Sequence, residues 1–158
     1  MKKQGFTLIE LMVVIVIMGI LAAVAVPKLF GTIAKSKASE VPTAAGTWIN
    51  LQDAYTVEAT SVGTWSQIGY NAPGEQDNSA SSHTNNFSYS DGKDGDKAKW
   101  SATALHKLND CNKGTWWSTA DATTDSDAGT TYVTIATGGD AACTGLTPSF
   151  ANLARSSN

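Results

Sequence analysis

The pattern of hydrophobic and polar positions divides the chain into three stretches of different character. Residues 6–26 are almost wholly apolar, residues 27–58 repeat apolar positions with a helical period, and residues 59–158 are mostly polar with scattered aromatic side chains. An apolar run of 21 residues covers about 30 Å as a helix, which matches the thickness of a bilayer core. The first stretch is therefore predicted to be a transmembrane helix.

The second stretch predicts an amphipathic helix, because its apolar positions recur every three or four residues and would share one face. The expected face comprises Phe30, Ile33, Lys37/Ala38, Val41, Ala44, Ala45, Trp48, Leu51 and Tyr55. Polar residues such as Asn50 and Gln52 are assigned to other faces. Pro27 and Pro42 each remove a backbone hydrogen bond and are expected to bend the helix. Residues 22–31 are expected to be its weakest part.

The third stretch predicts short strands joined by turns. Residues 130–136 alternate and are rich in β-branched side chains, so they form the best strand candidate. Residues 86–90 and 114–118 are weaker strand candidates, and residues 102–108 are expected to form a short helical turn. We expect an antiparallel sheet of three or four strands packed on the second helical stretch, which gives an α+β fold.

Charge and residue chemistry narrow the possible functions. The chain carries a formal net charge of −3, and its polar part has few Lys or Arg, so a broad nucleic-acid footprint is not expected. His83 and His106 are isolated in the sequence, and no serine or cysteine arrangement suggests a nucleophile. We therefore expect neither enzymatic activity nor a cofactor.

Two cysteines, Cys111 and Cys143, lie in the polar part of the chain. In an exported protein an even pair is most simply interpreted as one disulfide. Two unrelated buried thiols are the alternative.

Acidic and aromatic clusters offer two weaker hypotheses. Residues 91–96 alternate Asp with Gly, as calcium loops do, although the order does not match an EF-hand and a solvated turn is favoured. A second acidic cluster contains Asp121, Asp125 and Asp127. Trp116 and Trp117 would point to opposite sides of a strand, so one indole could stack on a sugar, although packing is favoured. No metal site is predicted.

The apolar run follows a short basic leader, and Glu10 interrupts this run at its fifth position. A charge there costs several kcal/mol in lipid, so Glu10 is expected to be paired. A glutamate that snorkels near a helix end is the alternative. Lys2 and Lys3 precede the run, and by the positive-inside rule they predict a cytoplasmic N-terminus.

The segment Gly5-Phe6-Thr7-Leu8-Ile9-Glu10 resembles the processing motif of type IV prepilins and of the related type II secretion pseudopilins. The resemblance continues to Pro27 and covers roughly the first 35 residues. It implies a type IV pilin-like fold with a long N-terminal helix on a small antiparallel β-sheet head. The implied parts are a leader (1–5), a transmembrane or filament-core helix (6–26), an amphipathic helix (27–58) and an exported head (59–158).

The resemblance also implies a processing chemistry. A prepilin peptidase would cut between Gly5 and Phe6 on the cytoplasmic face and then methylate the new amine of Phe6. That cationic amine is the expected partner of Glu10, on the same or a neighbouring subunit, and the pair would set the stagger between subunits. Phe6 and Glu10 are therefore the expected assembly residues.

The function implied is that of a structural subunit, which polymerises into a helical surface filament for adhesion, motility or uptake. Its expected partners are other copies, the peptidase, the assembly machinery of the bacterial inner membrane, and membrane lipid before assembly. The expected location is the inner membrane, crossed once with the N-terminus cytoplasmic, and then the extracellular pilus.

Two alternatives remain open. One is a type II secretion pseudopilin, but the major kind usually carries a calcium loop and lacks a C-terminal disulfide, so Cys111 and Cys143 favour the pilus. The other is a membrane-anchored carbohydrate-binding adhesin, which would use Trp116 or Trp117.

Overall fold

The computed structural model describes residues 5–94, 96–122, 131–139 and 141–155. Its elements are α1 (Leu8–Ala38), α2 (Glu40–Ala59), α3 (Trp65–Ile68), β1 (Glu75–Asn78), β2 (Ser81–His83), β3 (Phe87–Asp94), β4 (Lys97–Ala104), β5 (Thr115–Ala122), β6 (Thr131–Gly138), α4 (Ala141–Leu146) and the 3-10 helix η2 (Ala151–Leu153). The chain divides into two compact units, Met1–Ile33 and Ala34–Asn158. The expected α+β fold, with a long N-terminal helix and an antiparallel sheet, is confirmed.

The first unit is the apolar part of α1. Its large side chains are exposed along the whole length, as Leu8 at 83% and Val24 at 65% illustrate. The helix continues through Pro27 without a break. The expected weakness of residues 22–31 concerns an assembled filament and stays a prediction.

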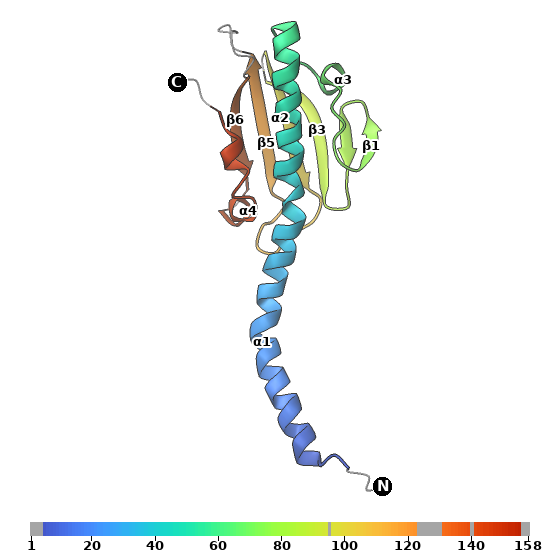
Figure 1. Ribbon diagram of the computed structural model, residues 1–158, viewed down its shortest axis with the longest axis vertical. Coiled ribbons are helices and arrows are strands. Elements are labelled where there is room, and N and C mark those ends of the chain that lie inside the picture. Colours follow the sequence, from blue (N-terminus) through green and yellow to red (C-terminus); the bar gives the residue numbers. More distant parts are fainter. Residues whose placement is uncertain (1–4, 95, 123–130, 140, 156–158) are drawn as a thin grey trace. The chain divides into compact units, whose positions relative to one another are not determined.

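The second unit is a six-stranded antiparallel meander covered by α2. The strand order is β1-β2-β3-β4-β5-β6, so each strand pairs with its neighbour in the sequence. Figure 1 shows α2 lying across one face of this sheet, where it contacts β4, β5 and β6. The expectation of three or four strands was too low, because β1, β2 and β4 lack the β-branched alternation that marks β6.

The core lies between α2 and the sheet and is mainly aromatic. Trp48 of α2 is fully buried, as the helical periodicity predicted, together with Val41, Ala44 and Ala45. The other large buried rings are Trp65, Tyr70, Phe87, Tyr89, Trp100, Trp116 and Phe150. Rings pack edge to face, for example Phe87 on Trp116 at a centroid distance of 5.6 Å. Such pairs add to the stabilisation that the burial of their area already gives.

The helix breaks at Ser39, three residues before Pro42, and not at Pro42 itself. A proline cannot donate to the carbonyl four residues earlier, which here belongs to Ala38, the last residue of α1. Pro42 itself lies in the first turn of α2, where a missing N–H is tolerated. The helix interruption expected at Pro42 is therefore found one turn earlier, at Ser39.

The helical turn expected over residues 102–108 is wrong. Residues up to Ala104 belong to β4, where Ala102 pairs with Tyr89 on one side and with Trp116 on the other. Alanine is the best helix former, but the preference is below about 1 kcal/mol per residue, and pairing between two aromatic neighbours in the sheet outweighs it. Leu108 instead forms an isolated bridge with Cys111.

The start of α2 is tied to the sheet by a partly buried polar network. Glu40 Oε1 accepts hydrogen bonds from Tyr89 Oη at 2.6 Å and from Thr84 Oγ1 at 2.8 Å. Burial, together with the bond to Glu40, raises the pKa of Tyr89, so its hydroxyl stays a donor. Because both donors come from the sheet side, Glu40 fixes where α2 begins.

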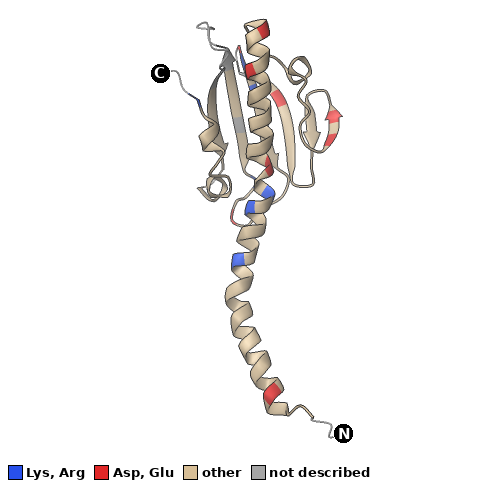
Figure 2. Ribbon diagram, in the orientation of Figure 1, with Lys and Arg blue, Asp and Glu red and all other residues tan. Residues whose placement is uncertain are grey.

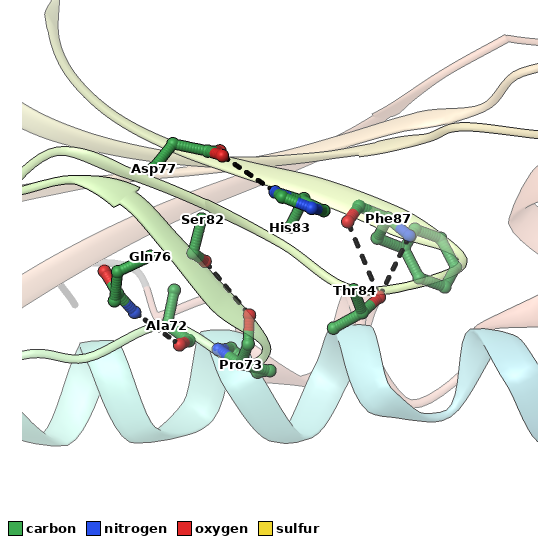
Figure 3. Close-up of polar contacts among 8 residues, drawn as sticks. All are labelled: Ala72, Pro73, Gln76, Asp77, Ser82, His83, Thr84 and Phe87. Atoms are coloured by element: carbon green, nitrogen blue, oxygen red, sulfur yellow. Dashed lines mark hydrogen bonds and ion pairs between the residues drawn. The ribbon is translucent and has the colours of Figure 1, made fainter.

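The β1–β2 hairpin is fastened by side-chain bonds to backbone carbonyls (Figure 3). Ser82 Oγ donates to Pro73 O at 3.0 Å, and Gln76 Nε2 donates to Ala72 O at 2.9 Å. His83, which is isolated in the sequence, lies 2.8 Å from Asp77 through its Nδ1. Ser82, the neighbour of His83 in the chain, donates its hydroxyl to Pro73 O and not to the imidazole.

Gln52 contradicts the assignment made from periodicity, because it is fully buried and not on a polar face. Its Nε2 donates to Gly63 O at 2.7 Å, and its Oε1 accepts from Gly63 N at 3.0 Å. One side chain therefore satisfies both backbone groups of a buried glycine and holds the α2–α3 loop against the helix. Ile49, also outside the predicted face, is buried beside it on α2.

Replacing Gln52 with Leu should lower the free energy of unfolding by about 2–4 kcal/mol, because two buried backbone groups lose their partners. The urea midpoint of the full chain in detergent micelles measures this loss. Asn50→Ala, on the exposed side of the same helix, is the matched control and should unfold near the wild-type midpoint. Equal midpoints for both variants would show that the Gln52–Gly63 bonds are not needed.

The predicted disulfide is confirmed: Cys111 and Cys143 are bonded at an S–S distance of 2.08 Å. It joins the β4–β5 connection to α4 after β6. Gly114 lies against it so closely that a Cβ there would sit 2.8 Å from Cys111 Sγ. A side chain at this position would therefore collide with the bridge.

Removing the disulfide by a Cys111→Ser, Cys143→Ser double substitution should lower the free energy of unfolding by about 3–4 kcal/mol. The loss follows from the 32-residue separation of the two cysteines, because the bridge limits the entropy of the unfolded chain. Urea unfolding measures it, and wild-type protein under reducing conditions should show a similar loss. An unchanged midpoint on reduction would contradict this account.

Candidate functional site

The candidate site is the N-terminal segment from Gly5 to Glu10, where the chain passes from non-helical backbone into helix α1. Gly5, Phe6 and Thr7 are not helical, and the helix begins at Leu8. Phe6 is 84% exposed. The scissile bond expected between Gly5 and Phe6 therefore lies in non-helical, exposed backbone, as a protease groove requires.

Thr7 and Glu10 form a reciprocal cap at the start of α1. Glu10 Oε2 accepts from Thr7 N at 2.9 Å and from Thr7 Oγ1 at 2.6 Å, and Glu10 N donates to Thr7 Oγ1 at 3.4 Å. This is a capping box, in which each residue satisfies a backbone N–H that the helix leaves unpaired. The carboxylate also lies near the positive end of the helix dipole, which favours its charge.

Thr7 is thus a site residue that the sequence prediction missed. The signal was present, since Thr followed three residues later by Glu before an apolar run is the capping-box pattern. The charge of Glu10 in lipid had predicted an ion-pair partner and not a helix cap. The structure gives Glu10 a partner within its own turn.

The cap uses only one of the two carboxylate oxygens of Glu10. Both bonds from Thr7 end on Oε2. Within the described part of the chain, Oε1 receives no hydrogen bond, and Glu10 is exposed. The carboxylate can therefore keep its cap and still accept a further donor. The expected pairing of Glu10 with the amine of Phe6 stays a prediction.

Helix α1 presents the longest apolar surface of the described residues. By length and composition, the helix that begins at Leu8 could cross a membrane. Figure 2 shows an acidic residue near the start of α1 and basic residues only in its second half. The acidic residue of the first turn is Glu10, and the basic residues of the last turn are Lys35 and Lys37. Such a surface requires lipid or protein around it.

The other sequence candidates do not gather into a second site. Trp116 is fully buried and donates its Nε1 to Thr147 Oγ1 at 2.7 Å, so it is not available to stack on a sugar. The side chain of Trp117 lies outside the described residues. Among the described residues, no three His, Cys, Asp or Glu side chains come together as metal ligands.

The acidic stretch 91–96 belongs mainly to a hairpin. Asp91 lies in β3 and accepts the backbone N–H of Trp65 at 2.9 Å, and partial burial raises its pKa. It therefore anchors α3 and does not lie in a solvated turn. The second cluster lies outside the described residues, as do the side chains of Asp94 and Asp121.

Comparison with known proteins agrees with the geometry of this segment. Residues 1–26 match the family model of the prokaryotic N-terminal methylation motif. The type IV major pilin protein PilA of Myxococcus xanthus is 47% identical over 57 residues, or 36% of this chain and 23% of that protein. The N-terminal part of the chain is thus similar to type IV pilin and fimbrial proteins.

Two further relatives match over similar parts of the chain. The type IV narrow pilus major component PilA5 of Thermus thermophilus is 38% identical over 74 residues, which is 47% of this chain and 64% of that protein. The type IV major fimbrial protein FimA of Dichelobacter nodosus is 52% identical over 44 residues, 28% of each chain. The match thus spans about a quarter of the length of two of these three relatives. No solved structure matches the chain significantly.

Replacing Thr7 with Val should loosen the first turn of α1, because the hydroxyl of the cap is lost while shape is kept. The loss of a cap costs about 1 kcal/mol, or about fivefold faster exchange of the first-turn amides. Hydrogen exchange of the chain in micelles measures this rate. Thr7→Ser keeps the hydroxyl and should exchange like wild type, whereas equal rates in all three proteins would refute the cap.

Proposed function

We propose that the chain is a structural subunit of a type IV pilus, which polymerises through α1 into a surface filament. The observation that carries the proposal is the junction at residues 5–10, which has an exposed, non-helical Gly5–Phe6 bond, a capped carboxylate and, directly after it, an exposed apolar helix. The names of the relatives, which are pilin and fimbrial proteins, support it.

The first step of the proposed life cycle is storage in the inner membrane. The apolar part of α1 would lie in lipid, and cleavage before it would keep the anchor. A prepilin peptidase would hydrolyse the Gly5–Phe6 bond on the cytoplasmic face and methylate the amine of Phe6. In this role the chain is a substrate and not an enzyme.

The second step is assembly through Glu10. Cleavage creates a cationic amine at Phe6, and a neighbouring subunit would bring it to Oε1 of Glu10, the oxygen left open by the cap. Neither charge is stable alone in an apolar filament core. Breaking such a buried pair by removing one partner costs about 3–5 kcal/mol, so the pair can fix the axial stagger between subunits.

Both alternatives have less support. The confirmed Cys111–Cys143 bridge favours a pilus over the major kind of secretion pseudopilin. The adhesin alternative loses Trp116 as a sugar platform, because that indole is buried. An adhesin would also have no use for a cleaved leader or for Glu10.

Glu10→Gln should abolish filaments in cells that produce the processed chain. A glutamine can still complete a capping box, so this substitution removes the charge and keeps the helix start. Electron microscopy of sheared surface fractions measures filament yield, and the main subunit of wild-type filaments should have the mass of a chain beginning at N-methyl-Phe6.

Glu58→Gln, an exposed glutamate on α2, is the matched control and should leave filaments intact. Thr7→Val should reduce yield less than Glu10→Gln, because it keeps the charge. Normal filaments from Glu10→Gln would overturn the proposed ion pair. Surface filaments of another subunit, with this chain retained whole in the membrane, would overturn the pilin function itself.

A further inference from the structure

Three lysines of α1, Lys28, Lys35 and Lys37, are exposed and lie beyond its apolar run. Within the described ranges none of these α1 lysines forms an ion pair or a hydrogen bond. The nearest acidic residue in the sequence, Glu40, accepts its bonds from Tyr89 and Thr84. The positive charges of the α1 lysines are therefore available to a group outside the chain.

The first of these lysines lies one bilayer thickness from Glu10. Lys28 follows Glu10 by 18 residues in a continuous helix, which corresponds to about 27 Å of rise. A hydrocarbon core measures about 30 Å. With Glu10 at one interface, Lys28 therefore reaches the opposite headgroup layer. Lys35 and Lys37 follow in the last turn of the same helix, and their long flexible stems can reach toward a charged surface.

Apolar side chains are interleaved with the α1 lysines. Leu29, Phe30 and Ile33 are exposed at 58%, 59% and 42%. Basic residues mixed with exposed aliphatic and aromatic side chains are typical of segments at a membrane interface. A purely solvated helix face would not need these apolar groups. The composition therefore favours lipid headgroups over bulk water as the surroundings of residues 28–37.

The α1 lysines also act against the orientation that a pilin needs. The leader carries two lysines, whereas three follow the apolar run, and positive charge near a span favours the cytoplasmic side. The cytoplasmic N-terminus that Lys2 and Lys3 predict is therefore opposed by the charge of the α1 lysines. An anionic partner at the outer surface would offset the cost of keeping the α1 lysines there.

We infer that the α1 lysines bind the phosphate groups of anionic phospholipids in the outer leaflet of the inner membrane. This contact would fix the depth of α1 while the subunit waits for assembly. The inference rests on the proposed function, because it requires α1 to span the bilayer. Each lysine held near an anionic surface changes lipid association by up to about fivefold.

The test uses the full chain reconstituted in phosphatidylcholine vesicles with trace spin-labelled phosphatidylglycerol or phosphatidylcholine. Wild type should associate with the anionic probe several-fold more than with the zwitterionic one. The triple variant Lys28→Gln, Lys35→Gln, Lys37→Gln should show nearly equal association. The preference of wild type for the anionic probe should also fall in 1 M salt, because the Debye length is then only about 3 Å.

A variant with the same loss of charge in the head, Lys93→Gln, Lys107→Gln, Lys113→Gln, is the matched control. These three lysines are also exposed, and the preference for the anionic probe should persist. Equal association of both probes with wild type, or an unchanged preference in the α1 variant, would overturn the inference.

Filament assembly separates this inference from the proposed function. If the α1 variant keeps its lipid preference but loses filaments, the lysines serve acidic groups of a neighbouring subunit, and the lipid inference fails while the pilin function stands. If wild type does not resist alkaline extraction from the vesicles, α1 does not span the bilayer. That result would refute the proposed function and this inference together.

Discussion

The exposed apolar surface of α1 is the constraint on which the rest of the molecule depends. From Leu8 to Ile33 its large side chains face outward, and burying such area contributes about 25 cal/mol for each Å² removed from water. The surface must therefore always have an apolar environment, first lipid and then other copies in the proposed filament. A polar group within it is tolerated only where its bonds are arranged in advance, as at Glu10.

The second unit is stabilised differently, because its small sheet must be held together by a core of its own. Its core is built on the buried face of α2, with Trp48 at its centre and the aromatic side chains of β3, β4 and β5 opposite. Polar bonds then fix the two ends of α2. Glu40 joins its start to Tyr89, and Gln52 holds the loop that follows its end to the helix. The disulfide joins α4, near the end of the chain, to the connection between β4 and β5.

The sequence predicted what depends on periodicity and strong motifs, and it failed where tertiary contacts decide. The apolar run, the face containing Val41 and Trp48, and the Cys111–Cys143 bridge were predicted correctly. Gln52 was placed on a polar face because its partner, Gly63, lies in a loop that only the fold brings close. Ala102 was assigned to a helix because its strand partners, Tyr89 and Trp116, are distant in the sequence. At the site, Thr7 was missed although its capping pattern is present in the sequence. The charge of Glu10 in lipid led to the prediction of a cationic partner, and a local hydrogen-bond partner was not considered.

The two carboxylate oxygens of Glu10 allow it both to cap its own helix and to accept a cationic partner. Had the carboxylate only a distant partner, it would enter the bilayer uncompensated and the chain could not wait there. Had it only the cap, it would carry no information about neighbouring subunits. With Oε2 bound by Thr7, the charge is partly satisfied before assembly, and Oε1 retains enough unmet acceptor capacity to select a cation. Under the proposed function, the local cap would lower the cost of storage in the membrane without removing the drive to assemble. A glutamate at the third position of the helix would then meet both requirements with one side chain.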